Sequence, residues 1–394
     1  DLHRQRQRLL VAHRRRHRAD VVVHLAQPIA RLDDGRFVLT WTAPDSTQTG
    51  VYARIVNADG TFASGAEFRV NTTTNGFERT ASAGALDDGG FVVTWTGRLA
   101  NGQETVMMQR YDAAGSAVGV ETVVPSYDFN HGTHYAKVEG LHDGGWVVIW
   151  QSYGIHGLNN AVDGSYSAGQ NDGIAGQRYD QSGNKVGSQF LVSLDSYGAE
   201  QKPSFDVRAD GAMVIAWLDA SGRRVEQLVV DQPDDVTYTS DMGLPTVINA
   251  GGQSPNGAYP RTIALQDGGH LTAWFEYVTA GSNAHIHAQR YDASGQAVGA
   301  EIDYAAGANN FFAGLAGPGV AQLTDGSIVF TWLYFGPGSS QYVLQGRLFD
   351  QDLNPLGTGN FQAEDATLTV SSGTYSYVEA LADGNFVVSW SSHA

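Results

Sequence analysis

The 394-residue chain contains no cysteine. A disulfide framework, a thiolate metal site and a cysteine nucleophile are therefore excluded. The chain also lacks any run of 18 apolar residues, so we expect no membrane span. No glycine-rich phosphate loop, dinucleotide fingerprint or serine-nucleophile elbow stands between a strand and a helix. These absences argue against nucleotide-dependent chemistry.

Basic residues are also scarce. The chain has 24 Lys and Arg against 41 Asp and Glu, which gives a net charge of -17. Such a chain should repel the phosphates of nucleic acid, so we expect no nucleic-acid partner. Residues 1–24 are the exception, because seven arginines fall within the first 20 positions. This segment is either a set of closing strands or a basic arm.

A sevenfold repeat dominates what is present. In each copy an Asp-Gly step is followed by a Trp that ends an apolar run, and successive Trp residues are 54–67 positions apart. The seven residues are Trp41, Trp95, Trp150, Trp217, Trp274, Trp332 and Trp390. Repeats of this length are typical of arrays and propellers.

The sequence of each repeat predicts four strands. In the third repeat the run 146–150 is apolar without alternation, so both faces of that strand should be buried. It follows Asp143-Gly144, a hairpin signal for which we expect positive φ at both residues. Trp residues in such strands should form the core rather than sugar platforms. We predict an all-β fold, a seven-bladed β-propeller of four-stranded antiparallel blades that forms a single domain over residues 1–394.

The last repeat stops at Ala394, after its second strand. We expect N-terminal strands within residues 1–24 to close this blade and so remove an exposed sheet edge. In this interpretation Gln7-Arg8 takes the place that Gln289-Arg290 holds in the fifth repeat, and residues 21–23 fall near the fourth strand.

Two polar positions recur as well. An arginine stands at one place in the third strand of five repeats, and a glutamate recurs in the fourth strand of three. These residues are Arg54, Arg110, Arg178, Arg290 and Arg347, with Glu67, Glu121 and Glu301. The simplest interpretation is a structural ion pair between adjacent strands. The alternative is a glycan site in every blade.

The repeat sequence itself resembles a known family. Residues 86–95, which read Leu-x-Asp-Gly-Gly-Phe-Val-Val-Thr-Trp, and the segments 177–187 and 289–299 are similar to repeats of large secreted bacterial proteins, the RTX-type adhesins and hemolysin-type calcium-binding exoproteins. The resemblance implies a binding or adhesion module at the cell surface or outside the cell, either a monomer or part of a larger secreted protein. The calcium-binding nonapeptide of that family does not occur here.

Function is expected where the repeats differ, on the face that carries the variable loops. Four cations lie at or just before the first strand of four successive repeats, namely Arg79, Lys137, Lys202 and Arg261. A ring of cations around a central funnel would suit an anionic polysaccharide, and Tyr127 and Tyr377 are further candidates for ligand binding. The alternative is pairing with carboxylates of the channel, for example Lys137 with Glu139 or Glu379.

A second cluster lies in the link that enters the third repeat. His131 and His134, with His156 from a later loop, could hold a divalent metal. His131, His134 and Tyr135 could instead serve as acid and base in a lyase.

Two further segments bear on metal binding. His285 and His287 place two imidazoles on one face of a strand away from the funnel. Asp350-x-Asp352-x-Asn354 resembles the start of a calcium loop, but Pro355 stands where that loop needs glycine, so an ordinary turn is favoured.

Two functions from different classes remain open. The first is a binding or adhesion propeller that recognises an anionic polysaccharide or cell-surface glycan through its loop face. The second is a polysaccharide lyase, or less favourably a hydrolase, that acts on an acidic glycan in the funnel.

Overall fold

The computed structural model describes residues 6–12, 29–45, 48–63, 67–74, 76–124, 133–152, 173–192, 201–219, 224–229, 246–248, 260–279, 283–305, 317–335, 342–362 and 376–392. Within these ranges the secondary structure consists of strands and turns. The strands form antiparallel sheets, six of four strands and one of three. No helix able to cross a membrane occurs in this part of the chain.

Each four-stranded sheet is a meander in chain order. The first three sheets contain β2 (Ile29–Arg31), β3 (Phe37–Pro44), β4 (Thr49–Val56) and β5 (Phe68–Arg69); β6 (Arg79–Ala85), β7 (Phe91–Arg98), β8 (Glu104–Tyr111) and β9 (Ala117–Val123); and β10 (Thr133–Gly140), β11 (Trp146–Ser152), β12 (Gly173–Tyr179) and β13 (Lys185–Leu191).

The next three sheets repeat this order. They contain β14 (Gln201–Val207), β15 (Met213–Leu218), β16 (Arg224–Val229) and β17 (Thr246–Val247); β18 (Arg261–Ala264), β19 (His270–Thr279), β20 (Asn283–Tyr291) and β21 (Ala297–Ala305); and β22 (Gly319–Gln322), β23 (Ile328–Phe335), β24 (Tyr342–Phe349) and β25 (Phe361–Gln362). The three-stranded sheet contains β1 (Arg6–Ala12), β27 (Phe386–Ser392) and β26 (Ser376–Ala380).

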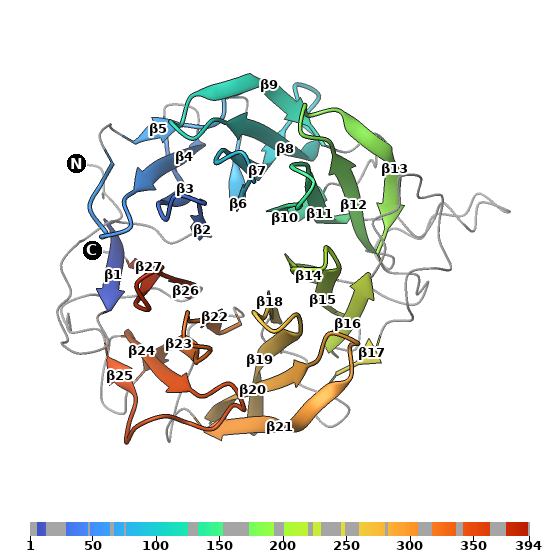
Figure 1. Ribbon diagram of the computed structural model, residues 1–394. Helices are drawn as coiled ribbons and strands as arrows, with labels where there is room; N and C mark the ends of the chain where they lie inside the picture. The colour runs from blue at the N-terminus through green and yellow to red at the C-terminus, as the bar shows by residue number, and fades with distance from the viewer. Residues whose placement is uncertain are drawn as a thin grey trace, which may run out of the picture.

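The sheets stand around a common centre (Figure 1). The first strand of each sheet, from β2 to β26, faces this centre, and the later strands lie progressively farther out (Figure 1). The predicted all-β propeller of antiparallel four-stranded blades is therefore confirmed.

The two ends of the chain share one sheet. β1 pairs with β27 in antiparallel register, with Leu9 opposite Ser389 and Val11 opposite Val387. In the fifth blade the residue that corresponds to Val11 is Arg290, which pairs with Leu271. The predicted equivalence of Gln7-Arg8 with Gln289-Arg290 is thus wrong by three residues, and the strand expected near residues 21–23 lies outside the described residues.

The repeated Trp residues form the core, as predicted. Trp150 and Trp274 are completely buried, and Trp95, Trp217 and Trp332 nearly so. The second strands are buried on both faces because a neighbouring sheet covers each face, and every residue of β11 is buried. This arrangement explains why their apolar runs do not alternate.

The Asp-Gly turns differ in type from the prediction. The Gly144 amide donates to Leu141 O at 2.9 Å, and the Leu141 amide donates to Gly145 O at 2.8 Å. Gly144 has φ of +82°, whereas Asp143 is not among the described residues with positive φ. The turn therefore uses glycine alone in the left-handed region, and the aspartate instead accepts a hydrogen bond from the Gly145 amide at 2.9 Å.

The repeated arginines have a structural role, but with a different partner from the one expected. Arg110, Arg178 and Arg290 form ion pairs with the aspartates of the Asp-Gly turns in their own blades, namely Asp88, Asp143 and Asp267. Of the repeated glutamates, Glu121 accepts a hydrogen bond from the Thr72 amide at 2.6 Å, in the preceding blade. The arginine thus links the third strand of a blade to the turn between its first two strands.

The segment that resembles a calcium loop forms a turn, as expected. Asp350 accepts hydrogen bonds from the Asn354 amide at 2.8 Å and from the Asn354 side chain. Leu353 takes positive φ at 64° within this turn.

Candidate functional site

The inner strands surround a central cavity of about 330 Å³. Many of the residues that line it come from two positions of each first strand. One position, here called the entry position, lies six residues before the aspartate of each Asp-Gly step. The other, the deep position, lies four residues before that aspartate and therefore two residues farther along the same strand face.

The entry position pairs with the residue that precedes the repeated Trp. Its described members are Ser82, Lys137, Ser204, Arg261, Gly319 and Tyr377. Lys137, Arg261 and Tyr377 thus stand on β10, β18 and β26, and small residues stand at the other described entry positions. The small residues leave room for the three long side chains to extend into one space.

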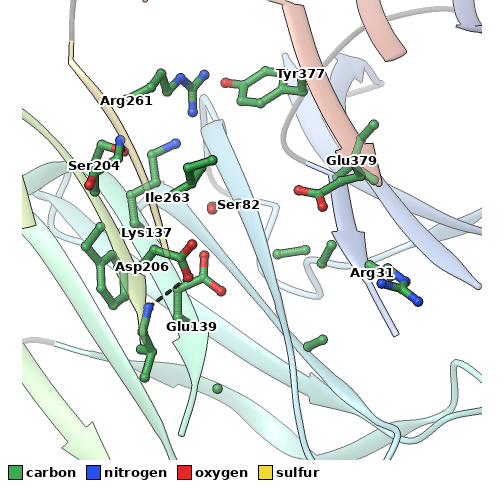
Figure 2. A pocket seen from close by; sticks show the side chains of 18 of the residues that line it. Arg31, Ser82, Lys137, Glu139, Ser204, Asp206, Arg261, Ile263, Tyr377 and Glu379 are labelled. Carbon is green, nitrogen blue, oxygen red and sulfur yellow. Dashed lines mark hydrogen bonds between the residues drawn. The ribbon is translucent and has the colours of Figure 1, made fainter. Parts of the chain in front are cut away.

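These three side chains meet at the top of the cavity. Figure 2 shows Arg261 and Tyr377 pointing toward one another, with Lys137 beneath Arg261. The guanidinium carbon of Arg261 lies 4.3 Å from the centre of the Tyr377 ring. This is the geometry of a cation–π contact.

Charge and burial shift the pKa values of this group. Burial would raise the pKa of the Tyr377 phenol, but the charges of Arg261 and Lys137 outweigh burial and lower it below the ordinary value. Burial lowers the pKa of Lys137, and Arg261 lowers it further, while Tyr377 and Glu139 act in the opposite direction. The entry position therefore favours negative charge at its centre, whether on the phenol or on a bound anion.

The deep position carries three carboxyl groups, Glu139, Asp206 and Glu379. Asp206 accepts hydrogen bonds from the Ala264 amide at 2.7 Å and the Val207 amide at 2.8 Å. In Figure 2 Glu139 and Asp206 lie together, and Glu379 lies on the same side as Arg31.

Burial is the main cause of the high pKa values of these carboxyls. It raises the pKa of Glu379 to about 8, with a further increase from Asp206 and a decrease from Arg31. Burial raises the pKa of Glu139 well above its usual range, and Asp206 and Glu379 add to this effect. Burial also raises the pKa of Asp206, against its two backbone hydrogen bonds. With its pKa at about 8, Glu379 keeps its proton near neutral pH and is then a weak partner for the cations above it.

A smaller cavity of about 80 Å³ adjoins the entry position. Lys137, Arg261 and Tyr377 line it, and Tyr135 and Lys202 complete it from the starts of β10 and β14. Tyr135 and Lys202 have positive φ, at 55° and 61°, and each lies at a register shift between its strand and the next. Such bulges redirect a strand, and they are common beside functional sites.

The structure brings three of the four predicted cations together and places the fourth elsewhere. Lys137, Lys202 and Arg261 share the smaller cavity. Arg79 lines neither cavity and forms an ion pair with Glu104 instead. Lys202 lies two residues before Ser204, so it occupies a different register from Lys137 and Arg261.

The predicted histidine cluster falls largely outside the described residues. This applies to Tyr127, His131 and His156, and to the side chain of His134. Tyr135 is described and lines the smaller cavity with Lys202.

The sequence analysis missed Asp206 and the contact between Tyr377 and Arg261. A usable signal existed, because counting back six and four residues from each Asp-Gly aspartate identifies both positions in every repeat. Aligning the cations by the apparent start of each strand failed, since Arg79 and Lys202 stand nine and eight residues before the aspartate of their Asp-Gly steps instead of six.

No family model and no curated protein matches this chain. A solved protein of unknown function from Dyadobacter fermentans is similar, with 13% identity, a TM-score of 0.56, and coverage of 86% of this chain and 97% of that one. The NanB sialidase of Streptococcus pneumoniae is similar at 9% identity and a TM-score of 0.54, over 83% of this chain and 68% of that one. At these identities the likeness shows the fold alone, a β-propeller.

Proposed function

We propose that this propeller binds an acidic polysaccharide at the entry position of its central cavity. The observation that carries the proposal is the convergence of Lys137, Arg261 and Tyr377 on one space from alternate blades. A guanidinium and an ammonium beside an aromatic ring suit an acidic sugar, because the cations can bind its carboxylate or sulfate while the ring contacts its apolar face.

The charge distribution supports this proposal. The chain is acidic overall, and these cations stand above carboxyls whose high pKa values limit their negative charge. An incoming anion would therefore meet positive charge that the deep position neutralises only in part. The cavity of about 330 Å³ also lies within the usual range for small-ligand pockets, which is enough for part of a polymer.

The wider setting follows from the repeats. The seven repeats, the sheets they form and the β1–β27 pairing support a closed seven-bladed ring. The resemblance to RTX-type exoproteins supports a location outside the cell or on its surface. The fold shared with the NanB sialidase indicates that such a scaffold can carry a carbohydrate-directed site.

One observation favours a lyase as the second candidate function. The pKa of the Tyr377 phenol is lowered, and its ring lies against Arg261. A phenolate there could take the proton beside a uronate carboxylate, while Arg261 or Lys137 neutralises the enediolate. The electron pair then forms the new double bond and the glycosidic oxygen leaves with its bonding pair, to be protonated by the phenol or by water. In this version Tyr377 takes the role predicted for His131, His134 or Tyr135.

Titration calorimetry against alginate, pectate and a sulfated glycan tests the proposal. We expect the parent to bind at least one of them, with affinity that falls as salt rises, and the Lys137→Ala/Arg261→Ala variant to bind at least 100-fold more weakly. Arg79→Ala is the matched control, because it removes a cation outside both cavities. Absence of binding to all three polymers, or equal weakening by Arg79→Ala, would refute the proposal.

An absorbance assay for unsaturated uronate products, run in parallel, separates the two functions. If the protein is a lyase, the parent forms product and Tyr377→Phe binds polymer without forming it. If the protein only binds, the parent forms no product at any polymer concentration.

A further inference from the structure

A group of histidines and acids lies on the outer part of the fifth blade, away from the central cavity. His285 and His287 are two residues apart on β20, so both side chains leave the same face of the sheet. Ile286 between them points to the opposite face and is completely buried in the core. On β21, Asp303 stands directly opposite His287, and on β19 Glu276 stands opposite His285.

The nitrogen and oxygen atoms of this group converge. One ligand atom each from His285, His287 and Asp303 can be chosen so that all three lie within 4.8 Å of one another. Asp303 Oδ1 contacts His285 Nδ1 and lies 3.7 Å from His287 Nε2. Glu276 Oε2 lies 3.9 Å from the same His287 nitrogen. Four tetrahedral ligands about 2.0–2.2 Å from a zinc ion are separated by roughly 3.3–3.6 Å, so small adjustments would close this set around one ion.

The orientation of His287 is fixed from two sides. Glu301 Oε1 lies 2.7 Å from His287 Nδ1, and the indole of Trp274 stacks on the imidazole at a centroid distance of 5.8 Å. A carboxylate that accepts the Nδ1 proton leaves Nε2 as the free lone pair and increases its basicity. This is the usual outer support of a metal-binding histidine.

The propeller does not require these residues for packing. At the position of His287 beside the repeated Trp, the other four-stranded blades place Tyr52, Met107, Ala175, Val225 and Gln345. Opposite these, where the fifth blade has Asp303, they place Arg69, Val123, Leu191, Val247 and Gln362. The fifth blade alone among them combines histidine and aspartate across this pair of strands.

We propose that His285, His287 and Asp303 bind a divalent transition metal, with Glu276 as a fourth ligand and Glu301 as the outer support of His287. Two imidazoles with carboxylates suit zinc, whereas calcium prefers a shell made of oxygen alone. The imidazoles are largely buried and Asp303 is exposed, so a hydrated ion can enter from the side of Asp303. This site is independent of the glycan proposal, because it lies on the outer strands.

Zinc titration of the chelator-stripped full chain, in competition with a chromophoric chelator, tests the site. We expect His287→Ala and Asp303→Asn to weaken zinc binding at least 10-fold, and Glu301→Gln to weaken it about 10-fold through the loss of outer support. His142→Ala is the control, because His142 contacts the Arg208 carbonyl and is not part of the group. Cobalt added to the parent should give the visible absorption of a tetrahedral ion, and His287→Ala should lose it.

The variants also distinguish this site from histidines elsewhere in the chain. Asp303 is exposed, so Asp303→Asn should keep the fold even if His287→Ala does not, and the melting curve of each variant checks this. Zinc binding of equal strength in the parent, Asp303→Asn and Glu301→Gln would overturn the proposal. A parent that gives no cobalt spectrum would overturn it as well.

Discussion

The repeated Trp of the second strand and the entry position of the first strand lie close together wherever both are described, but they differ in how far the residue type can vary. The Trp recurs in all seven repeats and is buried wherever it is described. From the second repeat to the last, the entry position is serine, lysine, serine, arginine, glycine and tyrosine in turn. The Trp fills a space between two sheets whose volume is fixed by close packing, whereas the entry residue faces a cavity. The comparison separates the residues that build the ring from those that it presents to a ligand.

The largest expected effect on stability comes from the repeated Trp residues. Trp150→Ala removes a completely buried side chain and should destabilise the protein by about 3–5 kcal/mol. Lys137→Ala, at the entry position of the same blade, should change stability by less than about 1 kcal/mol. Urea unfolding of the two variants measures both values. Equal losses would mean that the entry residues also hold the ring together.

The carboxyl groups of the deep position should make the stability of the protein depend on pH. The pKa of Glu379 is raised by burial from 4.5 to about 8, so folding favours its protonated form. Its contribution to stability is therefore complete below about pH 4.5 and disappears as the pH rises through about 8. Each unit of pKa difference between the folded and unfolded chain corresponds to about 1.4 kcal/mol, so the free energy of unfolding should change by a few kcal/mol over this pH range.

The melting temperature should accordingly fall between about pH 5 and pH 9. Glu379→Gln should flatten this decline, because an amide does not ionise, while Glu67→Gln on the surface should leave it unchanged. Parallel curves for the parent and Glu379→Gln would show that this carboxyl titrates normally.

The smallest expected effect lies in the Asp-Gly turns, which, like the repeated Trp residues, build the fold. Gly144→Val places a β-branched residue at φ of +82° and brings its Cβ within 3.2 Å of Gln181, so we expect a loss of about 1–3 kcal/mol. Gly359→Val is the matched control, because nothing lies within 4 Å of a Cβ there and its φ is not positive. Thermal unfolding compares the two. An unaffected Gly144→Val variant would show that the turn can adopt another type.

The architecture could be predicted because packing imposes a strict period on the sequence. Asp143, Gly144 and Trp150 have counterparts in every repeat, and each is required by a turn or a buried strand. The turn type was harder to predict, since Asp-Gly is compatible with a turn that needs one left-handed residue as well as with one that needs two.

The site was predictable only in part. Lys137 and Arg261 were identified by their charge, but Arg79 was grouped with them although it stands nine residues before the aspartate of its Asp-Gly step, whereas they stand six residues before theirs. The contact of Arg261 with Tyr377 joins residues 116 positions apart on different blades, and only the curvature of the ring brings them together.

The pairing of β1 with β27 has a consequence for the time at which the ring can form. Leu9 finds its partner Ser389 only after about 380 further residues have been made. At a ribosomal rate of about 5–20 residues per second, the first strand would wait roughly 20–80 seconds for that partner. The central blades can assemble within this interval, because each meander pairs strands that are close in the sequence. The β1–β27 pairing is thus the last of the described strand pairings to become possible, and the central cavity exists as an enclosed space only when it has occurred.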